Sequence, residues 1–436
     1  MGLLRIIRAL AAVLVLATCA APKPDVSEIV EFRLNPFGAV NRLPRANPLP
    51  EFGVAMHEFD DVADLEAART AGFSFVRFDA YWDQIESETG FDFSRQTAFL
   101  DELRAHDLKA LVILDYGHWL YGGTHLPNVE NREAFARYAE TTARTFAGRG
   151  VDYEIWNEPD VDEGKFLPPD RFADLILRSA EGVRRGDPQA RIVTGGLSWL
   201  DFTYLDSMLK AQDAQRPHAR IDAFGVHLYR RDIPESIAPD VARVRTMVRR
   251  VHGRIPIWNT EWGYSSYDLP FFEDGHDAHA PVRRAQQAVL VTRSFLSVWR
   301  AGIPRSVHYG IRDNAFNPNS DYDNHGLIDF RGNKKPSYYA VSTLLHVAAG
   351  RTYDGDYARM PESIRAARLS SRSNIVVAVW SEWRARRGVV SVPASRFVSA
   401  VDMLGAPLAP IARTDSQLAF DVAEEKGPIY LTFSRR

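Results

Sequence analysis

The 436-residue chain, with 45% hydrophobic and 25% charged residues, is long and apolar enough to fold around a large core, so we expect no extended disorder. Its formal net charge of −3 gives no sign of the basic face that nucleic-acid binding requires. The 12 histidines are scattered, without an HExxH motif or a Cys/His cluster at metal-ligand spacing. We therefore expect no nucleic-acid partner, no metal and no other cofactor.

The first 20 residues have the layout of a secretory signal peptide. Arg5 and Arg8 precede an apolar run, Ala9 to Ala17, which is too short to be a comfortable membrane span. We expect an exported protein, located in the periplasm or associated with the outer membrane of a Gram-negative bacterium.

Cys19 is the only cysteine, so an intramolecular disulfide is impossible. The segment LATC resembles a bacterial lipoprotein signal, in which Cys19 is acylated after cleavage and anchors the chain to a membrane, although Thr18 departs from the usual small residue. The alternative is ordinary cleavage after Ala20 or Ala21. Residues 21–49 then resemble a Pro-rich lead-in, with six prolines between positions 22 and 50.

From residue 50, short apolar runs alternate with longer amphipathic ones, a pattern typical of βα units around a parallel sheet. Helical patterns lie between the runs. The strand-like runs cover residues 52–59, 73–80, 109–117, 151–158, 191–199, 221–229, 255–263 and 306–313. Eight such units predict a (β/α)8 TIM barrel over residues 50–349.

Beyond a helix expected around residues 337–349, the sequence consists of short segments in which apolar and polar residues alternate, separated by turn residues. This pattern predicts a C-terminal antiparallel β-sandwich over residues 350–436. We interpret the sandwich as a packing partner for the barrel rather than a second active site, and we expect a monomer.

Polar side chains end most of the predicted strands. In a TIM barrel the catalytic groups stand at the C-terminal ends of the strands, so these residues are the first candidates for chemistry. The strand-end residues are His57, Asp79, Asp115, Glu158, His227, Glu261 and Asp313.

Strand alternation gives these side chains a direction. In the run 221–229, Phe224, Val226 and Leu228 share the face that would pack on helices, which turns His227 and Tyr229 into the barrel mouth.

In the run 73–80, the same alternation places Arg77 inside the barrel, where its charge must be paired, and we expect a carboxylate partner. We interpret Glu154 as a paired structural carboxylate and Asp160 as a loop or helix-capping residue. Glu158 and Glu261, which end the fourth and seventh runs, are the natural catalytic pair.

The motifs EIWNEPD (154–160) and NTEWGYS (259–265) resemble the acid/base and nucleophile signatures of the retaining glycoside hydrolases of clan A. Further matches are VRFDAYWDQIE (76–86), HLY (227–229) and KKPSYYA (334–340). Together with the appended sandwich, these motifs resemble glycoside hydrolase family 39, including its bacterial members encoded with exopolysaccharide biosynthesis genes.

The resemblance implies a retaining β-glycoside hydrolase that cleaves an extracellular or periplasmic polysaccharide or oligosaccharide. Glu158 would act as acid/base and Glu261 as nucleophile. By the same resemblance Asn157 would bind the 2-hydroxyl of the sugar, which requires the strand to bulge or end there. We expect Arg77 and Tyr229 to keep Glu261 charged, and the apolar surroundings of Trp156 to keep Glu158 neutral.

Aromatic residues in the expected loops could stack on the apolar faces of sugars. They include Tyr121 after the third run and Tyr264, Tyr267, Phe271 and Phe272 after the seventh. In the eighth run Tyr309 and Arg312 stand where many clan members place a tryptophan under the bound sugar. The full set expected to bind substrate is Arg77, Asn157, His227, Tyr229, Trp82, Trp119, Trp262 and Tyr309.

Two alternatives stay open. The first is an exo-acting, β-xylosidase-like enzyme on small glycosides. The second is a catalytically silent polysaccharide-binding lipoprotein that has kept the barrel. The presence of both Glu158 and Glu261, together with Arg77, Asn157 and Tyr229, favours an enzyme.

Overall fold

The computed structural model describes residues 29–436, except 58, 60, 61, 124, 163, 164, 216–219, 271–276 and 383–386. The expected signal peptide with Cys19, and the expected rim residues Phe271 and Phe272, lie outside the described residues. None of the helices in the described part of the chain combines the length and apolar character that a membrane crossing needs.

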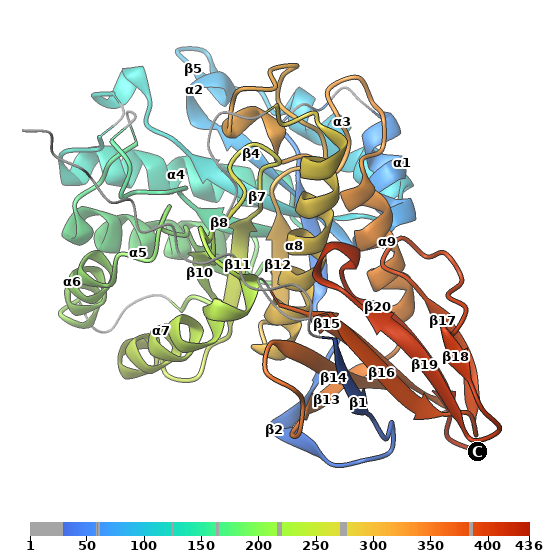
Figure 1. Cartoon of the computed structure of the whole chain (residues 1–436). Coiled ribbons are helices and arrows are strands. Elements are labelled where there is room, and N and C mark those ends of the chain that lie inside the picture. Colours follow the sequence, from blue (N-terminus) through green and yellow to red (C-terminus); the bar gives the residue numbers. More distant parts are fainter. Residues whose placement is uncertain are drawn as a thin grey trace, which may run out of the picture.

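Eight parallel strands form the central sheet, in the order β10-β11-β12-β3-β4-β7-β8-β9 (Figure 1). A parallel bridge between Val193 and Ala223 joins β9 to β10, so the sheet closes into a barrel. The strands are β3 (Glu51–Ala55), β4 (Phe75–Tyr81), β7 (Lys109–Asp115), β8 (Val151–Ile155), β9 (Ile192–Thr194), β10 (Phe224–His227), β11 (Ile257–Trp262) and β12 (Arg305–His308). Each lies in or overlaps a predicted run, and the (β/α)8 barrel is confirmed.

Helices surround the barrel (Figure 1). They are α1 (Val62–Ala71), α2 (Trp82–Ile85), α3 (Ser94–Ala105), α4 (Val129–Thr145), α5 (Pro169–Gly186), α6 (Phe202–Asp213), α7 (Ile237–His252), α8 (Pro281–Arg300) and α9 (Pro336–Ala348). The short 3-10 helices are η1 (Trp119–Tyr121), η2 (Pro234–Ser236), η3 (Tyr322–Asn324) and η4 (Glu424–Lys426), and β5 (Glu86–Ser87) with β6 (Gly90–Phe91) forms a small hairpin. Gly182 and Gly186 let α5 approach α4 closely, because a Cβ on either would lie 2.4 Å from a backbone oxygen of α4.

Two apolar layers follow from strand alternation. Phe75, Leu111 and Val307 belong to the cluster inside the barrel. Phe224 and Val226 belong to the larger cluster between the barrel and its helices, as the alternation in β10 predicted.

Two sheets make up the C-terminal sandwich. The four-stranded sheet has the order β1-β16-β19-β18 and the six-stranded sheet the order β17-β20-β15-β14-β13-β2. The C-terminal strands are β13 (Thr352–Tyr357), β14 (Ile364–Ser370), β15 (Asn374–Ser381), β16 (Gly388–Pro393), β17 (Phe397–Val401), β18 (Ala412–Arg413), β19 (Gln417–Val422) and β20 (Ile429–Ser434).

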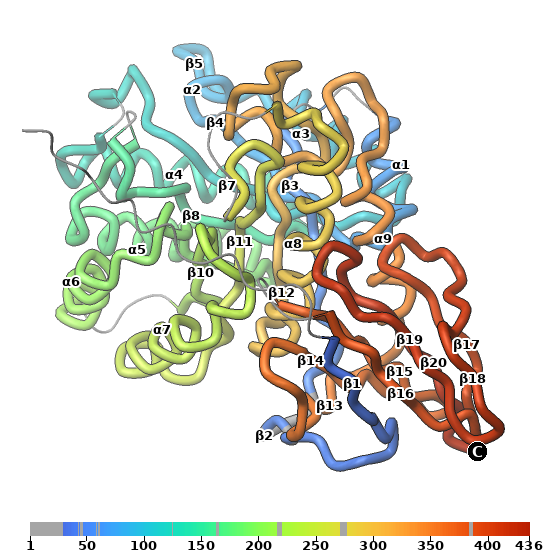
Figure 2. The backbone as a smooth tube through the Cα atoms, viewed as in Figure 1, coloured from blue at the N-terminus to red at the C-terminus, as the bar shows by residue number. Residues whose placement is uncertain are grey.

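Residues 30–48 correct one sequence interpretation. They were expected to belong to a lead-in, but β1 (Val30–Arg33) pairs in parallel with β16, and β2 (Val40–Pro48) pairs antiparallel with β13. In Figure 2 these two blue strands lie beside the orange and red C-terminal strands. The prolines of this region are compatible with pairing because β2 is the edge strand of its sheet.

A buried polar cluster joins the sandwich to the barrel. Glu235, in η2, accepts hydrogen bonds from Arg293 of α8 at 2.9 and 2.7 Å. Trp380 of β15 donates to the same carboxylate at 2.8 Å. Glu235 thus links a barrel helix to a sandwich strand in a region that water hardly reaches.

Candidate active site

A cavity of about 600 Å³ lies at the C-terminal ends of the barrel strands. Four of the predicted strand-end residues line it: His57, Asp79, Glu158 and Glu261. The cavity therefore lies where the sequence predicted the catalytic groups, at the C-terminal ends of the strands.

Arg77, on β4, is the centre of the site. Its Nε donates to Glu154 Oε2 at 2.7 Å, its Nη1 to Glu261 Oε2 at 2.6 Å and its Nη2 to Asn157 Oδ1 at 2.9 Å. The guanidinium is 1% exposed, and its planar fork suits several fixed acceptors at once. The predicted carboxylate partner of Arg77 is confirmed, and Glu154 is paired as expected.

Glu261, on β11, accepts a hydrogen bond at each oxygen. Arg77 binds one of them, and the Tyr229 hydroxyl donates to Oε1 at 2.8 Å. Burial, and then the charge of Glu261, raise the pKa of Tyr229 well above its ordinary value, so its hydroxyl remains a donor. The Glu261 carboxylate is therefore fixed in orientation by two donors from β4 and the β10 end.

Glu158 lies between two cationic groups. The Nδ1 atom of His227 is 3.0 Å from its Oε1, and Lys165 Nζ donates to its Oε2 at 3.0 Å. Burial raises the pKa of Glu158, but the hydrogen bond and charge of His227, followed by Lys165, outweigh burial and lower the pKa to about 2. The expectation of a neutral Glu158 beside apolar Trp156 is thus wrong.

The proton of this pair resides on His227. Burial lowers the pKa of His227, whereas the charge of Glu261 and the hydrogen bond to Glu158 raise it, and the net shift is upward. Trp156 does not act on Glu158 as expected, since its indole nitrogen donates to the backbone oxygen of Lys165 and holds the loop that delivers that lysine.

The backbone after β8 explains how two adjacent residues reach one cavity. The strand ends at Ile155, and both Trp156 and Glu158 adopt a left-handed conformation, with φ of 66° and 48°. This turn brings Asn157 and Glu158 to the cavity together, so the requirement that the strand end there is confirmed. Asn157 also donates to the Tyr116 hydroxyl at 2.9 Å.

One oxygen each of Glu158 and Glu261, together with a ring nitrogen of His227, lie within 4.8 Å of one another. Such a trio could hold a metal ion by geometry. However, the Arg77 and Lys165 cations lie 2.6 and 3.0 Å from the two carboxylates and oppose a further cation. The arrangement fits two carboxyl groups acting on one bond.

The Cellulase model, described as glycosyl hydrolase family 5, matches residues 45–291, which are 247 of the 436 residues. The chain belongs to this family. It is a clan A glycoside hydrolase, as the motifs around Glu158 and Glu261 indicated, and a carbohydrate is its substrate. No curated protein matches the sequence.

Solved structures share the fold of this family 5 chain at low identity. A family 39 glycoside hydrolase from Bacteroides cellulosilyticus WH2 has a TM-score of 0.71 and 17% identity, with coverage of 89% of this chain and 81% of that one. A family 30 endoxylanase from Clostridium papyrosolvens C71 has a TM-score of 0.63 and 13% identity, covering 93% and 100%. A glucosidase from Croceicoccus marinus has a TM-score of 0.64 and 12% identity, covering 94% and 100%.

Three tryptophans expected to bind substrate do not line the cavity of the family 5 chain. Trp82 is fully buried, and its ring stacks on Tyr121 at 4.9 Å. Trp262 is 3% exposed, and its indole nitrogen donates to Ser306 at 2.6 Å. It follows Glu261 in the strand, so alternation turns its side chain to the opposite face, away from the cavity. Trp119, at the start of η1, is 61% exposed but outside the cavity lining.

The other expected residues are brought together. Arg77, Asn157, Tyr229 and Tyr309 line the cavity, and His227 contacts Glu158. Arg312 points elsewhere: its guanidinium binds Asp64 at 2.8 and 2.6 Å.

Sequence reasoning missed several lining residues. The chief ones are Tyr81, Tyr116, Lys165, Trp199, Arg230, Arg231, Tyr322 and His325. Trp199 and Arg230 immediately follow or end predicted runs, so the rule that found Glu158 could have found them. Lys165 and Tyr322 stand in long loops, where the sequence carries no signal of direction.

The strand-end pair His57 and Asp79 had no assigned role, and in the structure His57 Nδ1 lies 3.0 Å from Asp79 Oδ2. Asp115 is fully buried instead of lining the cavity. Burial, and then the charge of Asp79, raise the pKa of Asp115 well above its ordinary value.

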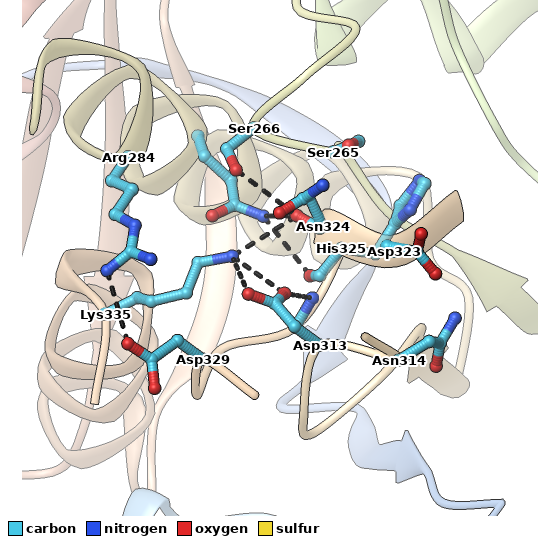
Figure 3. A network of polar contacts seen from close by, with 12 residues as sticks. Ser265, Ser266, Arg284, Asp313, Asn314, Asp323, Asn324, His325, Asp329 and Lys335 are labelled. Carbon is cyan, nitrogen blue, oxygen red and sulfur yellow. Dashed lines mark hydrogen bonds and ion pairs between the residues drawn. The ribbon is translucent and has the colours of Figure 1, made fainter. Parts of the chain in front are cut away.

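A buried polar network braces the loop between β12 and α9 (Figure 3). Lys335 donates to Asp313 Oδ1 at 3.0 Å and to the backbone oxygen of Asn324 at 3.2 Å. Burial lowers the pKa of Lys335 to about 8. Asp313 is therefore structural, and the network fixes the loop that carries Tyr322 and His325 to the cavity.

Proposed function

We propose that the chain is an exported, retaining β-glycosidase acting on an extracellular or periplasmic polysaccharide, with Glu261 as nucleophile and Glu158 as acid/base. One observation carries the proposal: the two carboxyl groups have oxygens within 4.8 Å of each other but entirely different partners. Retaining enzymes hold their carboxyl groups about 5 to 5.5 Å apart, whereas inverting enzymes leave room for a water, at about 6.5 to 9.5 Å.

In the first step, the free oxygen lone pairs of Glu261 attack the anomeric carbon while the glycosidic C–O bond breaks. Arg77 and Tyr229 keep the carboxylate aimed at that carbon. Glu158 gives a proton to the leaving oxygen, and the product is a glycosyl ester of Glu261 plus the released sugar alcohol.

His227 is the source of that proton. The imidazolium and the Glu158 carboxylate together hold one proton across a 3.0 Å hydrogen bond. When a leaving group enters beside Glu158, the proton moves from Nδ1 to Oε1 and then to the leaving oxygen.

In the second step, Glu158 takes a proton from water, and the water oxygen attacks the anomeric carbon. The ester bond to Glu261 breaks and the carboxylate is restored. Asn157, held between Arg77 and Tyr116, is placed to bind the 2-hydroxyl, an interaction that strengthens in the transition state.

A polymeric substrate is favoured over a small glycoside by the shape of the mouth. A second cavity of about 650 Å³ shares His57 and Tyr322 with the first, so the two cavities are neighbours at this end of the barrel. Exposed aromatic rings of Tyr322 and Phe330 line the second cavity, as a polysaccharide would require.

Incubation of the purified chain with a panel of polysaccharides tests the proposal. We expect reducing ends to appear with oligosaccharides as early products, and NMR of the first product to show the anomeric configuration of the substrate. Monosaccharide alone at the earliest time points would favour the exo-acting alternative. Polymer retention without reducing ends, equal in the wild type and in Glu261→Gln, would favour a binding protein.

A further inference from the structure

Apart from Arg77, whose charge is paired with Glu154 and Glu261, the Lys and Arg side chains of the cavity lie over three neighbouring strands. Lys165 follows β8, and Arg230 and Arg231 follow β10, while Trp199 follows β9 between them. The exposed acids of the lining follow β11 and β12 instead. One side of the cavity is thus cationic with an aromatic surface.

Arg231 is available for a ligand. Its guanidinium lies 5.5 Å from the ring centre of Trp199, and within the described residues it makes no ion pair, whereas Arg230 is bound by Asp240 at 2.7 Å. Trp199 is itself 49% exposed. A guanidinium beside an exposed indole can bind the carboxylate of an acidic sugar while the indole stacks on the apolar face of the same sugar ring.

Lys165, unlike Arg231 in the described part of the chain, is already paired with a carboxylate, that of Glu158. Its side chain is only 16% exposed, and its ammonium is bound to the very carboxylate that must donate a proton. An ammonium beside a carboxyl group favours the carboxylate form, so Lys165 disfavours the protonated Glu158 that the first step requires. Turnover should therefore be faster when a ligand neutralises Lys165.

The position of Lys165 indicates which part of the substrate would neutralise its charge. Glu158 protonates the leaving oxygen, so the groups next to it face the sugar unit that leaves. A negative charge on that unit would draw the ammonium away from Glu158 and allow the proton of His227 to cross.

We propose that the sugar unit on the leaving-group side carries a carboxylate, which Lys165 and Arg231 bind while Trp199 stacks on the ring. The substrate is then an acidic polysaccharide that contains a uronic acid. This inference rests on the proposed glycosidase function, because it takes the acid role of Glu158 as given.

Affinity gel electrophoresis tests it without turnover. Glu261→Gln would be run in gels that contain polygalacturonate, alginate or hyaluronan, with glucomannan as neutral polymer and dextran sulfate as sulfated one. We expect retardation by at least one uronan and binding at least about ten-fold weaker in the added double variant Lys165→Gln, Arg231→Gln. Lys210→Gln, which removes an exposed lysine paired with Asp206, is the charge-matched control and should bind normally.

The wild type, run in the cold, repeats the measurement in case Glu261→Gln is poorly folded. The inference would be overturned by any of three results. These are retention by no uronan, uronan binding that is as strong in the double variant as in the parent, and retention by dextran sulfate alone.

A pH profile separates this inference from the function on which it rests. With a neutral aryl glycoside, Lys165→Gln should move the alkaline limb of kcat/KM to higher pH, because a positive charge beside Glu158 is gone. Lys165→Arg should keep the wild-type limb and the uronan binding. No turnover by the wild type on any glycoside would refute the proposed function. Turnover with an unmoved limb in Lys165→Gln would refute the role of Lys165.

Discussion

His227 Nδ1 and Glu158 Oε1 lie 3.0 Å apart and are joined by a hydrogen bond. The pKa of His227 is raised and that of Glu158 is lowered to about 2, so a proton between the two groups favours the histidine. Activity should then depend on a histidine, although a carboxyl group performs the proton transfer.

The first prediction concerns this proton. Below the raised pKa of His227 the pair is protonated and the enzyme is active, and kcat/KM falls as the pH rises through that pKa. We expect the alkaline limb above the ordinary histidine value of about 6.5. His227→Asn should lower kcat/KM by about 100-fold on substrates with poor leaving groups and much less on activated aryl glycosides. An equal loss on both substrate types would show that His227 does not supply the proton.

The second prediction separates the two carboxylates. Glu261→Gln should abolish turnover on every substrate, because no covalent ester can form. Glu158→Gln should retain the first step on substrates with good leaving groups and be partly rescued by azide, since only proton transfer is lost. An activated 2-fluoro sugar should leave an adduct on Glu261, and mass spectrometry of peptides locates it. An adduct on another residue would contradict the assignment.

Sequence periodicity was sufficient for the scaffold and for the inward-facing polar residues. Arg77 and Glu261 lie where the strand ends and alternation placed them, because a barrel leaves a strand only an inner and an outer face. The same rule excludes Trp262 from the cavity, since it follows inward-facing Glu261. Trp262 was expected to stack on the sugar as an aromatic residue of the loop after this strand, and that expectation overrode the geometry and was wrong.

The electrostatics of Glu158 could not be read from its strand. Its pKa is set by burial, by His227, which lies far away in sequence, and by Lys165, which comes from a loop. The N-terminal strands were missed for a similar reason. The pairing of β1 with β16 joins residues more than 350 positions apart, and local sequence patterns do not predict so distant a contact.

The third prediction concerns the contact between the domains. Glu235→Ala would leave Arg293 buried without its carboxylate and remove the acceptor of Trp380. We expect a loss of about 3 to 5 kcal/mol in the free energy of unfolding, measured with a denaturant. Asp206→Ala, which breaks only the exposed pair with Lys210, should cost less than about 1 kcal/mol. Similar losses in both variants would argue against a structural role for the cluster.

The fourth prediction concerns Cys19. If it is acylated, metabolic palmitate should label the protein, globomycin should cause an unprocessed precursor to accumulate, and Cys19→Ala should release the chain from membranes. A mature protein that starts at Ala21 or Pro22 would instead show ordinary secretion.

The last prediction tests whether Arg77 organises the site through the shape of its guanidinium. Three of its nitrogens reach three partners, and the ammonium of Lys cannot span the same acceptors. Arg77→Lys should therefore lower kcat/KM by about 100-fold through misplacement of Glu261 and Asn157, even though the charge is kept.

Glu154→Gln is the matched control for Arg77→Lys. It retains an oxygen acceptor for Arg77 and leaves the contacts of Arg77 with Glu261 and Asn157 in place, so most of the activity should survive. If Glu154→Gln loses as much kcat/KM as Arg77→Lys while both stay folded, the charge of Glu154, and not the geometry of the fork, would control the nucleophile. Thermal unfolding of each variant separates a loss of catalysis from a loss of structure, because a variant that unfolds at the wild-type temperature has lost activity without losing its fold.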